Sequence, residues 1–256
     1  MSFSRRWLAL AWLIVLVVAL IMAAPARVLN HVLPASIIVL HSVSGSVWNG
    51  QAAGCLIRMP GGFLQLGQTH WTVSPLSLLL FAPSVSVKSQ WGKQRLRANL
   101  TYRGADHLRA SDVEARIDAG LLQAFLPVSL DGTLAVNMAS AEIKQGMPLS
   151  VVGRVVWEDA AWLSPQGAIP LGSYAVDSRQ VDRELQATIL TITGPLQADG
   201  LIKLSRKDDI ASYDLALELG SEGGMNPQLQ EALSLLASPT DTGYRLVLQG
   251  QLPPAD

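Results

Sequence analysis

The sequence predicts a mainly β protein, in which an N-terminal transmembrane helix is followed by antiparallel, duplicated β-sheet units with two short helices. Three observations support this fold class. Residues 7–24 form one uninterrupted apolar run, most segments after residue 25 alternate between apolar and polar residues, and helix-type spacing occurs at only two places. The 256 residues suffice for one large domain or for two of about 100 to 120 residues each.

The apolar run WLALAWLIVLVVALIMAA carries no charge and follows Arg5 and Arg6. Its roughly 18 residues would form about 27 Å of helix, enough to cross a hydrocarbon core of about 30 Å. Because cations stay on the cytoplasmic side, Arg5 and Arg6 place residues 1–6 in the cytoplasm and the chain after Arg27 in the periplasm. The alternative is a cleaved signal peptide with small residues at Ala24-Pro25-Ala26, but the run exceeds the usual signal core of about 7 to 15 residues. We therefore expect a single-pass inner-membrane protein.

Alternation with a period of two residues is clearest in residues 94–103. Successive side chains of a strand point to opposite faces, so this segment has one apolar and one polar face. Residues 213–219 and 244–248 repeat the pattern, which is typical of antiparallel sheets with one solvated face. Residues 185–193 differ, because this strand is apolar on both faces and needs burial on both sides or an apolar ligand on one.

Two segments have the signals of helices. Asn226-Pro227 combines an N-cap with proline at the first helical position, and Leu229, Leu233 and Leu236 then lie on one stripe. A weaker helix is predicted over residues 118–126, ending before a proline. Two short helices among about a dozen strands indicate a mostly β protein.

Similar residues and short motifs recur along the chain at offsets of about 105 to 111 residues. Trp48 corresponds to Trp157, Gly132 to Gly243, and Leu66-Gly67 to Leu171-Gly172. These corresponding motifs occur in the same order in both halves, so we expect an internal duplication. The predicted organisation is a cytoplasmic tail, a transmembrane helix and two periplasmic β units, over residues 1–6, 7–24, 25–138 and 149–256. Residues 145–148, QGMP, are interpreted as the linker.

The sequence contains no recognisable active site. The net charge of −1 provides no basic surface for nucleic acid, and the single cysteine, Cys55, excludes an internal disulfide and is interpreted as a small buried hydrophobe. The four histidines have no metal-ligand spacing, and neither a serine-nucleophile turn nor a phosphate-binding loop occurs. We expect no enzyme activity, no metal or other cofactor, and no small-molecule substrate.

Tryptophans outside the apolar run offer one candidate contact surface. Trp48, Trp71, Trp157 and Trp162 are interpreted as core residues, because a large ring fills the space between sheets. Trp91 is flanked by cationic and amide side chains in a segment expected to form an exposed turn. It is therefore the best candidate for contact with a partner or with lipid.

The segment VSGSVWNGQA, residues 43–52, carries a resemblance to a known family. Together with the N-terminal apolar run and residues 71–77, it resembles protein N of the bacterial type II secretion system. The resemblance extends loosely to the C-terminus through residues 130–134, LDGTL. Its motif residues, which read as a strand ending in an Asn-Gly turn, are Val43, Gly45, Val47, Trp48, Asn49 and Gly50.

This resemblance implies an inner-membrane component of the machine that exports folded proteins from the periplasm, with no assigned enzymatic activity. Its implied partners are the lipid bilayer and other inner-membrane or periplasmic secretion components. The corresponding hypothesis is an assembly subunit that docks its neighbours through sheet faces or strand edges. The competing hypothesis is a lipid-binding or lipid-transfer module similar to AsmA proteins, in which a β-groove receives acyl chains.

Overall fold

The structure is a computed structural model of the chain, and it confirms the mainly β architecture. The residues that it describes are 12–13, 15–16, 19–20, 22–34, 36–59, 62–79, 82–104, 107–124, 128–144, 147–182, 184–207, 210–221 and 223–252. Arg5 and Arg6 lie outside these residues, as does much of the predicted transmembrane segment 7–24. Within the described residues, no helix combines the length and the apolar character needed to cross a membrane.

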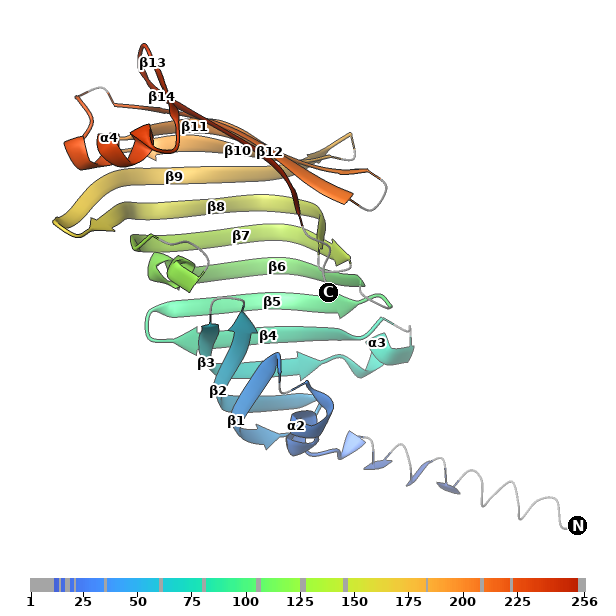
Figure 1. Cartoon of the computed structure of the whole chain (residues 1–256). Coiled ribbons are helices and arrows are strands. Elements are labelled where there is room, and N and C mark those ends of the chain that lie inside the picture. The colour runs from blue at the N-terminus through green and yellow to red at the C-terminus, as the bar shows by residue number, and fades with distance from the viewer. Residues whose placement is uncertain are drawn as a thin grey trace, which may run out of the picture.

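One antiparallel sheet of 14 strands organises the molecule (Figure 1). Each strand from β1 to β12 pairs with its neighbours in sequence, and β14 then lies between β12 and β13. The strands are β1 (Ile38–Gly45), β2 (Asn49–Met59), β3 (Gly62–Val73), β4 (Ser84–Trp91), β5 (Gln94–Tyr102), β6 (His107–Asp118), β7 (Leu130–Lys144), β8 (Met147–Ser164), β9 (Gly167–Val181), β10 (Glu184–Thr193), β11 (Gln197–Lys207), β12 (Ile210–Gly220), β13 (Ser238–Thr240) and β14 (Gly243–Leu252).

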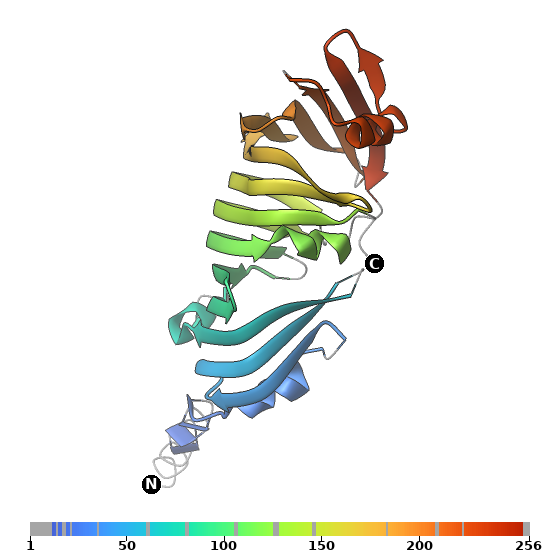
Figure 2. The same cartoon turned by 90° about the vertical axis from the view of Figure 1, so that its left-hand side faces the viewer.

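Short helices lie along one side of this sheet (Figure 2). Both predicted helices are present, α4 (Pro227–Ser234) and η2 (Ala119–Ala124), although η2 is a 3-10 helix. The Asn226 side chain accepts a hydrogen bond from the Gln228 backbone N–H, which confirms the predicted N-cap. The structure adds η1 (Ala26–Val28), α2 (Leu29–Val32) and α3 (Pro75–Leu79).

The strands on either side of the predicted linker pair with each other inside the continuous sheet. Lys144 at the end of β7 pairs with Met147 at the start of β8, and the pairing of these strands continues to Leu130 and Trp162. The β strands before and after this point therefore form one sheet. The duplication of residues 25–138 and 149–256 stays a prediction.

Register keeps mainly apolar residues on one face of the sheet, and polar residues on the other face from β1 to β10. The rows that run through Val136 and Asn137, neighbours on β7, illustrate this. The first row, which defines the apolar face, is Val43, Ala52, Thr69, Ser89, Leu96, Ala115, Val136, Val155, Val176, Ile189, Gly200, Leu217 and Leu246. The second row, which defines the polar face, is Ser44, Gln51, His70, Lys88, Arg97, Glu114, Asn137, Arg154, Asp177, Thr188, Leu201, Ala216 and Val247.

The sheet is covered by little else, and the molecule has an unusually large surface. The chain exposes 16772 Å², whereas a compact protein of this mass exposes about 11,000 Å². Among the described residues, no large side chain is fully buried, and many of the buried positions are alanines. The fold therefore lacks the thick core of a two-layered domain.

The main core lies at the C-terminal end, where α4 packs on the apolar face. Leu229 and Leu233 of α4 contact a cluster that includes the buried residues Tyr174, Leu196 and Leu219. The Tyr174 hydroxyl lies 2.9 Å from the backbone oxygens of both Leu171 and Leu196. Removal from water disfavours the phenolate, so burial raises the pKa of Tyr174 to about 12.

We predict that the contribution of Tyr174 to stability depends on pH above pH 10. The folded protein favours the neutral phenol, so its contribution is complete below the ordinary pKa near 10 and is lost as the pH rises toward 12. At neutral pH, Tyr174→Phe should cost about 1–3 kcal/mol, because the buried backbone oxygens of Leu171 and Leu196 lose the single O–H donor that they share. Urea unfolding of both proteins should show this difference shrinking between pH 10 and 12. A difference that does not change with pH would contradict the assignment.

Candidate functional site

The apolar face is open between two covered ends. At the N-terminal end, Ala26 of η1 is buried against Ala52 and Trp71, with Leu29 of α2 packed beside them. At the other end, α4 packs on a cluster that includes residues of β9, β11 and β12. Between them, the described chain has only short helices at strand ends, η2 beside β6 and β7 and α3 beside β3 and β4 (Figure 1). Half-buried apolar residues such as Leu96, Val136 and Val155 therefore face a surface that no second sheet covers.

Both edges of the sheet also offer unpaired backbone. Within the described chain, β1 has a strand partner only in β2. At the opposite edge, the short strand β13 pairs only with residues 243–245 of β14. The rest of β14, from Leu246 onward, has its outer side free of described strands, and Val247 and Leu248 are exposed. Such an edge can accept a strand from another protein.

The family motif contains a turn between Gly45 and Asn49, whereas the sequence predicted an Asn-Gly turn at residues 49–50. Strand β1 contains Val43 and ends at Gly45, whereas Asn49 and Gly50 are already the first residues of β2. The turn is closed by Ser46, whose backbone N–H donates to the Asn49 backbone oxygen at 2.9 Å. The Val47 N–H donates to the Ala24 oxygen at 3.0 Å, so the same turn holds the chain that leaves the N-terminal segment.

Trp71 of β3 closes this turn from the apolar face. Its indole N–H donates to the Val47 backbone oxygen at 3.1 Å, and its ring covers Gly50. Trp157 of β8 has a similar environment, because its indole N–H donates to the Asp131 oxygen at 3.1 Å and lies against Gly132. Trp157 and Trp71 therefore have similar environments, while the correspondence of Trp157 with Trp48 stays a prediction. Trp48 itself is half-buried, and its backbone oxygen accepts from the Val73 N–H at 2.7 Å.

Trp91 combines an exposed part with a structural contact. It ends β4, and 48% of its surface is exposed. On the neighbouring strand, Gly67 has a φ of +67°, and a Cβ at that position would lie 2.7 Å from the Trp91 Cβ. The ring thus packs over a glycine that no other residue could replace without strain. Its role as a contact for a partner stays a prediction.

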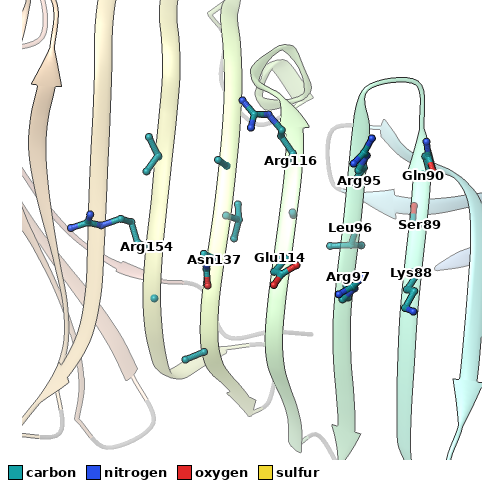
Figure 3. Close-up of a pocket in the computed structure, with 16 residues that line it drawn as sticks. Lys88, Ser89, Gln90, Arg95, Leu96, Arg97, Glu114, Arg116, Asn137 and Arg154 are labelled. Atoms are coloured by element: carbon teal, nitrogen blue, oxygen red, sulfur yellow. The ribbon is translucent and has the colours of Figure 1, made fainter.

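The polar face carries a hollow over β4 to β8 with a volume of about 940 Å³ (Figure 3). Five cationic side chains and a single carboxylate, that of Glu114, line it. A smaller hollow of about 530 Å³ extends it over β3 and shares two of the same cations, Lys88 and Arg97. The cations that line the larger hollow are Lys88, Arg95, Arg97, Arg116 and Arg154.

Two of these cations are paired with carboxylates on the β8–β9 side. Arg116 forms an ion pair with Glu158, and Arg154 holds Asp177 through two hydrogen bonds of 2.6 Å. The hydrogen bonds from Arg154 lower the pKa of Asp177. Among the described residues, no carboxylate lies within ion-pair distance of the other three cations, Lys88, Arg95 and Arg97.

Metal-ligating side chains are dispersed in the described chain. No cluster of three or more metal-ligating side chains occurs there. Cys55 is a buried free thiol, as predicted, and burial raises its pKa, an effect partly offset by a hydrogen bond with Thr69. Sequence reasoning did not identify the basic hollow. The sequence did show a polar face on residues 94–103. It did not show the strand pairing that brings Lys88 and Arg116 beside this strand.

The contact between Gly50 and Trp71 generates a testable prediction. A Cβ at position 50 would lie 2.4 Å from the Trp71 ring and 2.7 Å from the Ser46 backbone oxygen, so Gly50→Ala should lower the unfolding free energy by about 1–3 kcal/mol. Gly54→Ala in the same strand is the matched control, because its Cβ would meet only the His41 side chain, at 3.6 Å. Denaturant unfolding followed by tryptophan fluorescence measures both. Equal effects of the two variants would contradict the proposed contact.

Comparison with known proteins places the chain among secretion components. A type II secretion system protein N from Aeromonas hydrophila is 26% identical over 246 residues, which cover 91% of this chain and 93% of the relative. The protein N of Pectobacterium carotovorum subsp. carotovorum is 24% identical over 235 residues, 90% of each chain. That of Vibrio cholerae serotype O1 is 27% identical over 249 residues, 93% of this chain and 95% of the relative.

No solved structure gives a significant match to the chain. The family model described as type II secretion system (T2SS), protein N matches residues 37–247, which include strands β1 to β13 in full and the first part of β14. The resemblance seen in residues 43–52 is thereby confirmed over most of the sequence. The chain belongs to the type II secretion system protein N family.

Proposed function

We propose that this protein is an inner-membrane-anchored, non-catalytic component of the type II secretion machinery that acts through protein contacts in the export of folded proteins. In this proposal residues 7–24 cross the inner membrane once, with Arg5 and Arg6 in the cytoplasm and the sheet in the periplasm. The apolar run, its flanking arginines and the family membership support this arrangement.

The sheet would begin directly at the membrane surface. The hydrogen bond from Val47 to Ala24 and the bridge between Pro25 and Ser46 attach the end of the N-terminal segment to the first hairpin. Because Ala26 is buried against Ala52 and Trp71, the connection has little freedom to swing. An anchor attached in this way would fix the orientation of β1 relative to the bilayer.

The observation that carries the assembly role is the single-layered middle of the sheet. A stable protein interface buries roughly 800 Å² on each partner. The open apolar face between η1 and α4 offers apolar surface for such an interface, and the outer side of β14 offers free backbone groups. A partner could cover the face or add a strand at the edge.

A lipid-handling role is the second candidate, and the same uncovered apolar face favours it. Leu190 and Ile192 also expose 42% and 56% of their surface on the polar side of β10, so this strand presents apolar groups on both faces. An acyl chain could lie along such a surface, as in the AsmA-like comparison. The two candidates differ in what contacts the apolar face.

Photo-crosslinking separates the candidates, because Val136 and Asn137 are adjacent on β7 but lie on opposite faces. We expect a photoreactive residue at position 136 to crosslink to a type II secretion protein in cells, and deletion of the gene to impair secretion of a folded periplasmic substrate. Lipid adducts at position 136 and none at 137, with normal secretion, would support the lipid role instead. Normal secretion without adducts at either position would contradict both.

The proposed topology is tested by the charges that flank the apolar run. Alkaline phosphatase fused to the C-terminus should be active, because it needs the disulfide-forming environment of the periplasm. Replacing Arg5 and Arg6 by Glu leaves Arg27 as the nearest cation and should lower phosphatase activity severalfold. Arg58→Glu, far from the apolar run, is the control and should have little effect. An inactive fusion in the unaltered protein would contradict the proposed orientation.

A further inference from the structure

We propose that the basic hollow on the polar face binds an extended acidic segment of a protein partner, positioned over β3 to β5. This inference rests on the proposed function, because it names the chemistry of one partner of the assembly. It concerns the polar face, whereas the preceding tests concern the apolar face and the anchor.

Register places like charges directly opposite one another in this hollow. Lys88 pairs with Arg97 across β4 and β5, and Arg95 pairs with Arg116 across β5 and β6. Directly opposite side chains have Cβ atoms about 4.5–5.5 Å apart, and like charges at this distance destabilise a sheet. The chain as a whole has a net charge of −1, so this concentration of cations is local. Arg116 is partly compensated by its ion pair with Glu158, whereas Lys88, Arg95 and Arg97 have no ion pair with a described carboxylate. An anionic ligand would relieve the remaining repulsion.

The cations are spaced for an extended chain. Arg95 and Arg97 lie two residues apart on one face of β5, which separates them by about 6.6 Å along the strand. Carboxylates on alternate residues of an extended acidic segment have the same separation. A segment running along β5 would therefore bring one carboxylate to the row of Lys88 and Arg97 and the next to the row of Arg95 and Arg116.

Surrounding charges limit where this segment can lie. Glu114 on β6 follows Arg97 in the row, and Glu158 and Asp177 occupy the β8–β9 side, where they already hold Arg116 and Arg154. These carboxylates would repel an acidic ligand on that side. On the opposite side, the smaller hollow continues over His70 and Thr72 without a carboxylate in its lining. The electrostatic potential that attracts an acidic segment thus extends over β3 to β5.

The shape of the site favours a peptide over a membrane surface. A flat bilayer contacts protruding residues, whereas Lys88 and Arg97 line two adjoining hollows in the middle of the strands. One strand separates the smaller hollow from β1 and two strands separate the larger one, so the hollows begin about 10 Å and about 15 Å from β1 at the usual strand spacing. A narrow extended segment can reach these cations.

The test uses the full chain in neutral detergent and a labelled peptide in which glutamate and serine alternate. Fluorescence anisotropy should show binding that weakens as salt rises, and a peptide with glutamine in place of glutamate should bind at least tenfold more weakly. The double variant Arg95→Gln, Arg97→Gln should weaken binding of the acidic peptide about tenfold. It should unfold at the same or a higher temperature, because two like-charge pairs are relieved.

The matched control is the double variant Arg179→Gln, Lys203→Gln. These two residues lie on the same polar face, joined in one row by Gln186, but outside both hollows. The control removes the same charge and should change peptide affinity by less than twofold. If both double variants weaken peptide binding equally, the loss of affinity is explained by net charge alone and the proposal is overturned.

A second arm presents vesicles of phosphatidylglycerol and phosphatidylcholine to the protein in place of the peptide. If the Arg95→Gln, Arg97→Gln variant loses vesicle binding but keeps peptide binding, the hollow recognises lipid headgroups and the proposal is wrong. Failure of the peptide to bind would also overturn it. Neither result would affect the topology or secretion tests, so failure of this inference is distinguishable from failure of the proposed function.

Discussion

A sheet with one apolar face depends on keeping its register, because a slip of one residue would exchange the two faces of every later strand. The protein keeps one phase of alternation from β1 to β14, even though several strands contain extra residues. Bulges absorb these residues, and two of them contain aspartates with positive φ, Asp112 at +50° and Asp159 at +50°. Aspartate tolerates this conformation better than most residues. The covered ends, the open apolar face and the basic hollow all follow from this constant phase.

Local patterns were sufficient to predict individual elements. The alternation in residues 94–103 corresponds to β5, and the cap and leucine spacing after Asn226 correspond to α4, because both signals arise from neighbours in sequence. The same patterns could not decide between one sheet and two, since either arrangement needs strands with one apolar face. That question is answered by the pairing of Lys144 with Met147, where the linker was expected.

The parts that sequence reasoning missed depend on residues that are distant in sequence. The motif turn lies at Ser46–Asn49 because Trp71, more than twenty residues later, supplies the indole N–H that binds Val47. The basic hollow likewise requires β4, β5 and β6 to align Lys88 with Arg97 and Arg95 with Arg116. Each of these side chains alone resembles an ordinary solvent-exposed cation. Only their register turns them into a site with a specific charge and spacing.

The order of strands has a consequence for how the polypeptide acquires its structure. From β1 to β12 every strand hydrogen-bonds to the one synthesised just before it, so no pairing waits for a distant segment. Contacts of short sequence separation close small loops and form quickly. A chain emerging N-terminus first on the far side of a membrane could therefore extend its sheet one hairpin at a time. Only β14, which bypasses α4 and β13 to reach β12, must wait for the last residues to arrive.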